Sequence, residues 1–366
     1  MTKIKKLLFT DLLHNNQKPP LWSVRDMASD LTIIIPAFNE AKSIADTVKS
    51  LKNQTVKVAR IIVVDDFSSD GTGEIARAAG AEVLRPEANT GTKAGAQNFA
   101  LKSVTTKFTM AIDADTILAP DAIERLLPAL QDPKVAAACG FVLPRYVRTL
   151  WERGRYIEYL FAFVFFKQVQ DYYECPLISS GCFSVYRSSV LQANGGWSTR
   201  TMAEDMDLTW SFYQAGHKVR FVTGALCYPI EPNNYTFMSK QLRRWSHGFI
   251  QNFKFHWRGV LRVPYLRSVV IIAMIDAVIA SIFNILLLPA LIIFVSPLFA
   301  IIYLADLPAV MVPVLFQAVS RKETGLAISS IPAYFVLRTF NGFMFLEALI
   351  TEVVLRRTLA TYEKGH

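Results

Sequence analysis

Apolar runs alternate with polar segments in the first part of the chain. Runs at positions 31–36, 60–66, 81–84 and 108–115 consist mainly of β-branched and other apolar residues, and polar segments of helical character separate them. Strands without a polar alternation are typical of parallel sheets that are covered on both faces. The pattern therefore predicts β-α-β units and an α/β domain with a mostly parallel, Rossmann-like sheet and helices on both faces.

The last hundred residues are far more apolar. Positions 268–319 contain no Lys or Arg and only two acidic residues, which is long enough for two membrane spans of about 20 residues each. Ser296-Pro297 is suited to the turn between them. A third apolar stretch at 327–355 contains four polar interruptions, namely Arg338, Asn341, Glu347 and Glu352.

The last apolar segment has two interpretations. Three spans would place Arg356 and Arg357 across the membrane, against the positive-inside rule, so an interfacial or re-entrant last segment is the alternative to the three helices that we expect. Polar residues within these segments either face a pore or bond to one another; they are Asp276, Asn284, Asp306 and Arg338.

Composition and charge agree with a chain that is part soluble and part membrane. Mean hydropathy is +0.28 although 19% of residues are charged. The net charge of +9 arises before residue 268, and positions 237–267 hold seven cations and no acid among several aromatic residues. A stretch of this kind next to a lipid segment favours a cytoplasmic interface helix over a nucleic-acid site.

The cysteines and the first thirty residues add two further expectations. The four cysteines contain no C-x-x-C pair, so they indicate neither a zinc site nor a disulfide framework, and we interpret them as reduced and cytoplasmic. Residues 1–30 lack the pattern of a signal peptide and are expected to form a tail or an amphipathic helix at 4–14.

Several polar side chains follow the predicted strands, where ligands bind in open α/β sheets; they are Asn39, Glu40, Asp65, Asp66, Asp113 and Asp115. For a single Asp, a helix cap or a turn is the simpler interpretation. Asp113 and Asp115, however, are two carboxylates two residues apart, a pair that can hold Mg²⁺ or Mn²⁺ against a diphosphate. Lys93, in a run that also contains Gly91 and Gly95, could contact the same phosphates.

Seven short motifs occur in a fixed order along the chain. They are Pro36-Ala-Phe-Asn-Glu40, Val64-Asp-Asp66, Lys93-Ala-Gly95, Asp113-Ala-Asp115, Ser180-Gly-Cys-Phe-Ser-Val-Tyr-Arg187, Ala203-Glu-Asp205 and Gln241-Leu-Arg-Arg-Trp245. The set resembles the family-2 glycosyltransferases, and more closely their processive membrane synthases of hyaluronan, chitin, cellulose and poly-N-acetylglucosamine. The resemblance covers positions 31–257 and implies a GT-A-like fold.

The resemblance also implies roles for residues at the donor site. Ala37, Asn39, Glu40 and Asp66 would line the uridine pocket, and Lys93 would face the diphosphate. Asp113 would lie near the ribose and phosphate, and together with Asp115 it would hold Mn²⁺ or Mg²⁺.

The remaining motifs are implied to serve catalysis and the acceptor. Asp205 matches the general base of the family, with neighbouring Glu204 raising its basicity; the alternative is that this pair caps the helix expected at 206–215. The Q-x-x-R-W motif assigns Gln241 and Arg244 to the diphosphate and Trp245 to the acceptor sugar, and their spacing puts all three on one helix face. Trp245 as a membrane anchor is the alternative. Phe183 and Tyr186 are expected at the acceptor floor.

Together these expectations describe an integral membrane enzyme with a cytoplasmic catalytic domain at 31–236, interface helices at 237–267 and about three transmembrane helices at 268–366. It would transfer a sugar, GlcNAc or glucose, from a UDP-sugar to a growing β-linked polysaccharide. Single-sugar transfer to a lipid-linked or protein acceptor is the alternative. A conduit for the polymer would need a homo-oligomer or lipid, so translocation of the polymer stays open. The alternative that is not an enzyme is a membrane scaffold that senses UDP-sugar.

Overall fold

The structure is a computed structural model that describes residues 21–305 and 307–359. The expected N-terminal tail or helix at 4–14, and Asp306, lie outside the described residues. The described part begins with helix α3 (Leu21–Ser29), which leads directly into the first strand.

Within the described chain, eight strands form one sheet in the order β3-β2-β1-β4-β7-β6-β8-β5. The strands are β1 (Leu31–Ala37), β2 (Arg60–Asp65), β3 (Glu82–Leu84), β4 (Phe108–Ile112), β5 (Ile117–Leu118), β6 (Val135–Val142), β7 (Phe183–Arg187) and β8 (Lys218–Tyr228). The first four in the order are parallel, as predicted. Strand β7 runs antiparallel to both of its neighbours, whereas β6 and β8 are parallel to each other.

Both faces of the sheet are buried, which explains the continuous apolar runs. Ile33 and Ile35 of β1 belong to one hydrophobic cluster, and Ile34 between them belongs to a second cluster on the other face. The covering helices of the α/β domain are α4 (Ile44–Lys52), α5 (Thr72–Ala78), α6 (Lys93–Leu101), α7 (Ala122–Leu126), η1 (Leu127–Leu130), α10 (Ser188–Ala193) and α11 (Glu204–Gln214). The predicted α/β architecture with two covered faces is confirmed.

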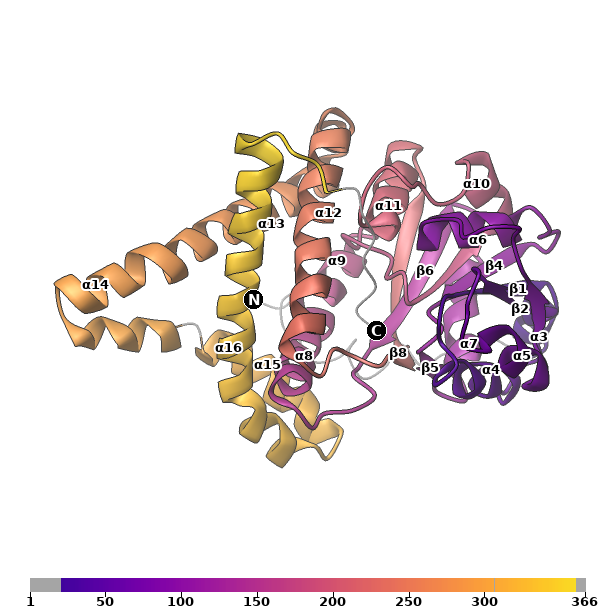
Figure 1. Cartoon of the computed structure of the whole chain (residues 1–366), viewed down its shortest axis with the longest axis horizontal. Helices are drawn as coiled ribbons and strands as arrows, with labels where there is room; N and C mark the ends of the chain where they lie inside the picture. Colours follow the sequence, from indigo (N-terminus) through magenta and orange to yellow (C-terminus); the bar gives the residue numbers. More distant parts are fainter. Residues whose placement is uncertain (1–20, 306, 360–366) are drawn as a thin grey trace, which may run out of the picture.

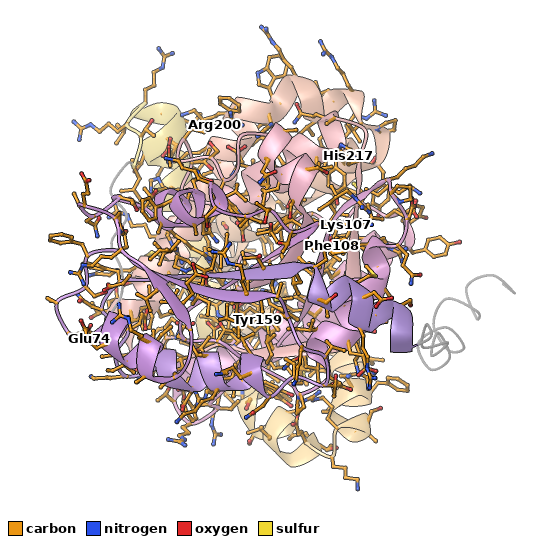
Figure 2. All side chains as sticks on the ribbon, turned by 90° about the vertical axis from the view of Figure 1, so that its right-hand side faces the viewer. Glu74, Lys107, Phe108, Tyr159, Arg200 and His217 are labelled. Atoms are coloured by element: carbon orange, nitrogen blue, oxygen red, sulfur yellow. The ribbon has the colours of Figure 1, made fainter. Side chains whose placement is uncertain are left out.

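The parallel strands bring their carboxyl ends to one edge of the sheet. Figure 2 shows Lys107 and Phe108, at the beginning of β4, apart from Glu74 in the first turn of α5, which follows the end of β2. In the register of the sheet, Ala37 at the end of β1 lies opposite Asp65 at the end of β2. The polar residues that follow these strands are therefore neighbours in space.

A second group of helices lies beside the α/β domain. It comprises α8 (Leu150–Phe161), the π-helical turn η2 (Ala162–Phe166), α9 (Lys167–Tyr172) and the long helix α12 (Tyr235–Arg262). The Asn234 side chain accepts a hydrogen bond from the N–H of Phe237 at 2.9 Å and so fixes where α12 begins. The α12 helix covers much of the segment that the sequence assigns to the interface.

Three helical segments near the C-terminus are long and apolar enough to cross a membrane: Pro264–Phe294, Pro297–Ser320 and Thr324–Val354. They contain, in turn, α13 (Pro264–Ile282), η3 (Phe283–Leu287) and α14 (Leu288–Phe294); η4 (Pro297–Leu304) and α15 (Leu307–Ser320); and α16 (Thr324–Leu349) and η5 (Ile350–Val354). The first two segments are separated at Ser296, where a turn was predicted. Figure 1 shows α14 in a hairpin that projects away from the rest of the molecule, whereas α15 lies against α8 and α16 runs beside α12.

The polar residues of these segments differ in their surroundings. Asp276 of α13 is exposed. The backbone carbonyl of Asn284 accepts a hydrogen bond from the Tyr303 hydroxyl at 2.8 Å. Asn341 of α16 instead bonds to α8, outside the apolar segments.

All four cysteines are free thiols in the described chain.

Candidate active site

The loops after β1 and β2 are held together by the residues expected to line a uridine pocket. Asn39 has a positive φ of 55°, and its side-chain oxygen accepts a hydrogen bond from the N–H of Ser69 at 3.0 Å. Glu40 is buried, its N–H donates to Thr72 and its carboxylate accepts from Ser43. These residues give the edge of the sheet a defined shape.

Asp66 connects the same edge to the loop that carries Lys93. Its carboxylate accepts hydrogen bonds from the N–H of Thr90 at 2.8 Å and from the Thr90 hydroxyl at 2.9 Å. Its own N–H donates to the carbonyl of Ala37 at 2.8 Å, which couples it to β1. The three motifs that contain Ala37, Asp66 and Lys93 thus meet in the structure, although more than fifty residues separate the first from the last.

Lys93 lies among several carboxylates. It is the first residue of α6, whose N-cap Thr92 accepts from the N–H of Gly95 at 3.0 Å. Its Nζ is 2.5 Å from Asp113 Oδ1 and 3.5 Å from Glu204 Oε1, and it donates to the Gly181 carbonyl at 3.1 Å. One partly buried ammonium group therefore brings together motifs from three separate parts of the chain.

Asp205 is the carboxylate best placed to act as a base. Its Oδ2 accepts from the N–H of Gly181 at 2.7 Å, and its Oδ1 accepts from the N–H of Met206 at 2.9 Å. Burial and the neighbouring Glu204 raise the pKa of Asp205 to about 6, while Lys93 and the two backbone N–H groups oppose the rise. A carboxyl group with such a pKa can accept a proton near neutral pH more readily than an ordinary one.

The glycine at position 181 is required by the close approach of this base. A Cβ atom built on Gly181 would lie 2.9 Å from Asp205 Oδ2 and 3.2 Å from Lys93 Nζ. Glu204 and Asp205 are the first two residues of α11 and its N-cap is Ala203, so the pair does not cap the helix but lies in its acidic first turn, which the helix dipole favours. The start of α11 thus presents Asp205 to the cluster.

Asp113 and Asp115 form the part of the site that suits a metal ion. Burial raises the pKa of Asp113, Asp115 and Glu204 add to the rise, and Lys93 opposes it. In the part of the chain that the structure describes, no group of three or more His, Cys, Asp or Glu residues could hold a metal by itself. The donor set fits a hard cation that takes one or two carboxylates and completes its shell with phosphate oxygens and water.

Helix α8 places a buried arginine against the Q-x-x-R-W motif. The helix starts with a capping box between Thr149 and Glu152, and Arg155 lies one turn further on. The Arg155 side chain is fully buried, and its Nη2 donates to Gln241 Oε1 at 2.6 Å. Its guanidinium carbon is 4.6 Å from the centre of the Trp245 ring. Gln241 and Trp245 therefore share one face of α12, as their spacing predicts, while Arg244 of the same motif is half-buried.

Two glutamates balance the charge of Arg155. Glu158 forms an ion pair with Nη1, and Glu231 Oε2 lies 3.4 Å from Nε. The hydroxyl of Tyr159 donates to Glu231 Oε1 at 2.8 Å. Burial raises the pKa of Glu231, with Arg155 opposing and Asp115 adding to the rise. The charge of Glu231 thus interacts both with Asp115 of the candidate metal site and with Arg155, which contacts the Q-x-x-R-W helix.

Sequence reasoning missed Arg155, Glu158 and Glu231. Arg155 and Glu158 are spaced i, i+3 on a helix, which is also a common surface ion pair. Glu231 stands in a loop with no recurring pattern around it. No signal in a single sequence distinguishes these residues from ordinary charged ones, because their roles arise from contacts with α12.

Phe183 and Tyr186 are not on the open surface of the site. Both side chains are buried, and Tyr186 packs edge-on against Trp197 with ring centroids 5.5 Å apart. They belong to β7, which lies between β4 and β6 and is covered on both faces. These two rings therefore lie within the core, and their expected place at the acceptor floor stays a prediction.

The fold is that of a glycosyltransferase. A mannosyltransferase, PcManGT from Pyrobaculum calidifontis, solved in complex with GDP-Man and Mn²⁺, matches with a TM-score of 0.55 at 17% identity; the match covers 89% of this chain and 93% of that chain. Residues 32–194 match the model of the family described as Glycosyl transferase family 2. Residues 32–194 of this chain therefore match a family-2 glycosyltransferase domain, as the ordered motifs predict.

Curated relatives point to the same family. The poly-beta-1,6-N-acetyl-D-glucosamine synthase of Staphylococcus epidermidis is 26% identical over 231 residues, which cover 62% of this chain and 56% of the relative. The synthase of the same description from Staphylococcus aureus strain COL is 27% identical over 238 residues, covering 64% and 57%. The matched part of this chain thus spans a little over half the length of these relatives.

Proposed function

We propose that this chain is a membrane-bound, inverting glycosyltransferase that transfers GlcNAc or glucose from a UDP-sugar to the non-reducing end of a growing β-linked glycan. The observation that carries the proposal is the position of Asp205, whose pKa is raised to about 6, beside the Lys93 cluster. The relatives described as poly-beta-1,6-N-acetyl-D-glucosamine synthases support GlcNAc as the first sugar to test.

The donor would bind along the carboxyl edge of the sheet. Ala37, Asn39, Glu40 and Asp66 form the end of the site that would receive the uridine. Lys93, Gln241 and Arg244 would contact the diphosphate. Asp113 and Asp115 would hold Mn²⁺ or Mg²⁺, which when bound neutralises charge on the diphosphate leaving group.

Transfer would occur in one displacement. Asp205 takes the proton from an acceptor hydroxyl while that oxygen forms a bond to the anomeric carbon of the donor. The bond between the anomeric carbon and the diphosphate oxygen breaks, and UDP leaves with the electron pair. The configuration inverts, so an α-linked donor yields a β-linked product. Trp245, which is 38% exposed, would stack on the acceptor sugar.

Membrane association would keep the acceptor close to the enzyme, with the catalytic domain on the cytoplasmic side. Met238 and Leu242 of α12 pack against Leu337 of the apolar helix α16, within a turn of Gln241. This proximity also favours a second candidate function, single-sugar transfer to a lipid-linked acceptor. The two functions share the donor site and differ in the product.

The test is to incubate the protein in lipid nanodiscs with Mn²⁺ or Mg²⁺ and a panel of labelled UDP-sugars, and to determine the size of the product. We expect one donor to give a polymer; a labelled lipid of discrete size would identify the second function instead. Asp205→Asn should abolish the product, whereas Asp26→Asn, the same change at an exposed position in α3, should not. Turnover that survives Asp205→Asn would contradict the mechanism, and UDP binding without turnover of any donor would contradict both functions.

A further inference from the structure

The three apolar segments do not take up equivalent positions. The segments Pro264–Phe294 and Pro297–Ser320 each contact the helical layer at one end, where α13 packs against α12 and α16 and α15 packs against α8. Their other ends extend away from it and meet at a tip with Phe294 83% exposed and Leu298 74% exposed (Figure 1). The third segment, α16 with η5, stays in contact with α8 and α12. Length and hydropathy do not separate these two situations; they differ in that α16 with η5 is held over its whole length, from Ser329 to Glu352.

Polar contacts tie α16 to the catalytic part of the molecule from one end to the other. Near its start, Ser329 accepts from Arg153 of α8, and at its middle Asn341 donates to Glu158 Oε1 at 2.8 Å. Near its end, Glu347 pairs with Arg243 at 2.9 Å. In η5, the buried Glu352 accepts from His247, Gln251 and Lys254, all of α12.

The α12 and α16 helices run in the same direction, because later residues of one contact later residues of the other. Leu337 packs with Met238 and Leu242, and Phe345 packs with Ile250. The α12 helix carries six cations and no acid: Lys240, Arg243, Arg244, Lys254, Arg258 and Arg262. If α16 crossed the bilayer, α12 would have to cross beside it and bring these charges into the hydrocarbon, which is strongly unfavourable.

The α8 helix holds α16 equally closely. A Cβ atom on Gly154 would lie 2.8 Å from the carbonyl oxygen of Ala333 and 2.9 Å from Leu337 Cβ, so the two backbones approach as far as glycine allows. Since α8 also contributes Ile157 and Leu160 to the core beside the sheet, α16 is anchored to the α/β domain.

The outer face of α16 is apolar. Ile328, Val336, Phe343 and Ile350 are between 45% and 53% exposed. At about 100° per residue, these four positions fall within an arc of about 80° on the helix. A narrow apolar stripe opposite a protein-bound face fits a helix that lies along a bilayer and buries this stripe at the boundary of headgroups and acyl chains.

We infer that α16 with η5 is a membrane-surface helix and that the segments 264–294 and 297–320 are the two membrane spans. The apolar stripe of α16 is then a docking surface for the lipid leaflet on the side of the catalytic domain. This arrangement puts Arg321, Lys322, Arg356 and Arg357 on that same side, in agreement with the positive-inside rule, whereas three spans would split them.

The inference is tested by which side of the membrane three positions face, a measurement that does not depend on enzyme activity. Cysteines are introduced at exposed positions: Lys102→Cys in the α/β domain, Val295→Cys at the hairpin tip and Leu355→Cys after η5. Sealed cells are treated with a membrane-impermeant maleimide before and after permeabilisation. The unmodified chain, whose native cysteines are buried or half-buried, gives the background.

We expect Leu355→Cys to label like Lys102→Cys and unlike Val295→Cys. Labelling of Leu355→Cys together with Val295→Cys would show a third span and overturn the inference. Equal labelling of all three would show that the hairpin does not cross, and would overturn it as well.

A second measurement tests the lipid contact. Nitroxide labels at positions 328, 336, 343 and 350, read by depth-dependent relaxation in nanodiscs, should all report a similar shallow depth. A depth that passes through a maximum between 336 and 343 would show a spanning helix, and labels exposed only to water would show that the stripe does not contact lipid. Either result would refute the assignment.

Discussion

The rate of sugar transfer should fall steeply in mild acid, because Asp205 must be ionised to accept the proton of the acceptor. Its pKa of about 6 lies well above the ordinary value of 3.8. From these values, about nine tenths of the base is ionised at pH 7 and about one tenth at pH 5. We therefore expect kcat/KM to be about tenfold lower at pH 5 than at pH 7, while an unshifted carboxylate would lose less than about a tenth of its activity.

The direction in which Glu204 shifts the pKa of Asp205 gives an internal control. Glu204→Gln removes a negative charge beside Asp205, so the pKa of Asp205 should fall and the acid limb should move to lower pH. Initial rates would be measured between pH 4.5 and 8.5 as labelled sugar incorporated into product, which avoids a pH-sensitive coupling enzyme. The Asp26→Asn variant should keep the wild-type profile. A wild-type rate that stays constant down to pH 5, or an acid limb that Glu204→Gln moves upward, would refute the role given to Asp205.

Four further predictions concern the site and its support. Gly181→Ala should lower kcat by about 10²-fold with the fold retained, because its Cβ would displace the base, whereas Gly325→Ala, in open space, should be silent in the same assay. Arg155→Met should lower the unfolding free energy by about 3–5 kcal/mol, measured by chemical unfolding, because it leaves buried Glu231 and partly buried Glu158 without their countercharge. Arg155→Lys should keep stability better yet raise KM, and equal effects of both variants would contradict a positioning role. Gly154→Ala should lower the unfolding free energy by about 1–3 kcal/mol, since the Ala333 carbonyl cannot yield; an unchanged melting curve in detergent would speak against this contact. Chelation with EDTA should stop transfer, and added Mn²⁺ or Mg²⁺ should restore it; activity that persists would exclude a divalent ion.

Local pattern was sufficient to predict the architecture of the catalytic domain. The runs that became β1, β2 and β4 are mainly apolar because both of their faces are covered, and this property is visible in the sequence itself. The break at Ser296 and the spacing of Gln241 and Trp245 are equally local, since a turn and a helix face depend on neighbouring residues alone.

The sequence also predicted which motifs would gather at one edge, because the carboxyl ends of parallel strands meet there. It could not predict the antiparallel insertion of β7, which depends on how distant strands pair. For the same reason the burial of Phe183 and Tyr186 was not foreseen: their exposure is set by the strands and helices that cover β7.

Only the tertiary structure decided which charged residues contact one another. Lys93, Asp113 and Glu204 are adjacent because three distant segments converge, and Arg155 reaches Gln241 because α8 packs against α12. The position of α16 is decided in the same way. Hydropathy measures how a segment would partition into lipid by itself, whereas the bonds from Asn341, Glu347 and Glu352 to α8 and α12 show what the segment packs against. Composition is a property of one segment alone, whereas a contact needs two segments. Which second segment lies beside the first is decided by the tertiary structure.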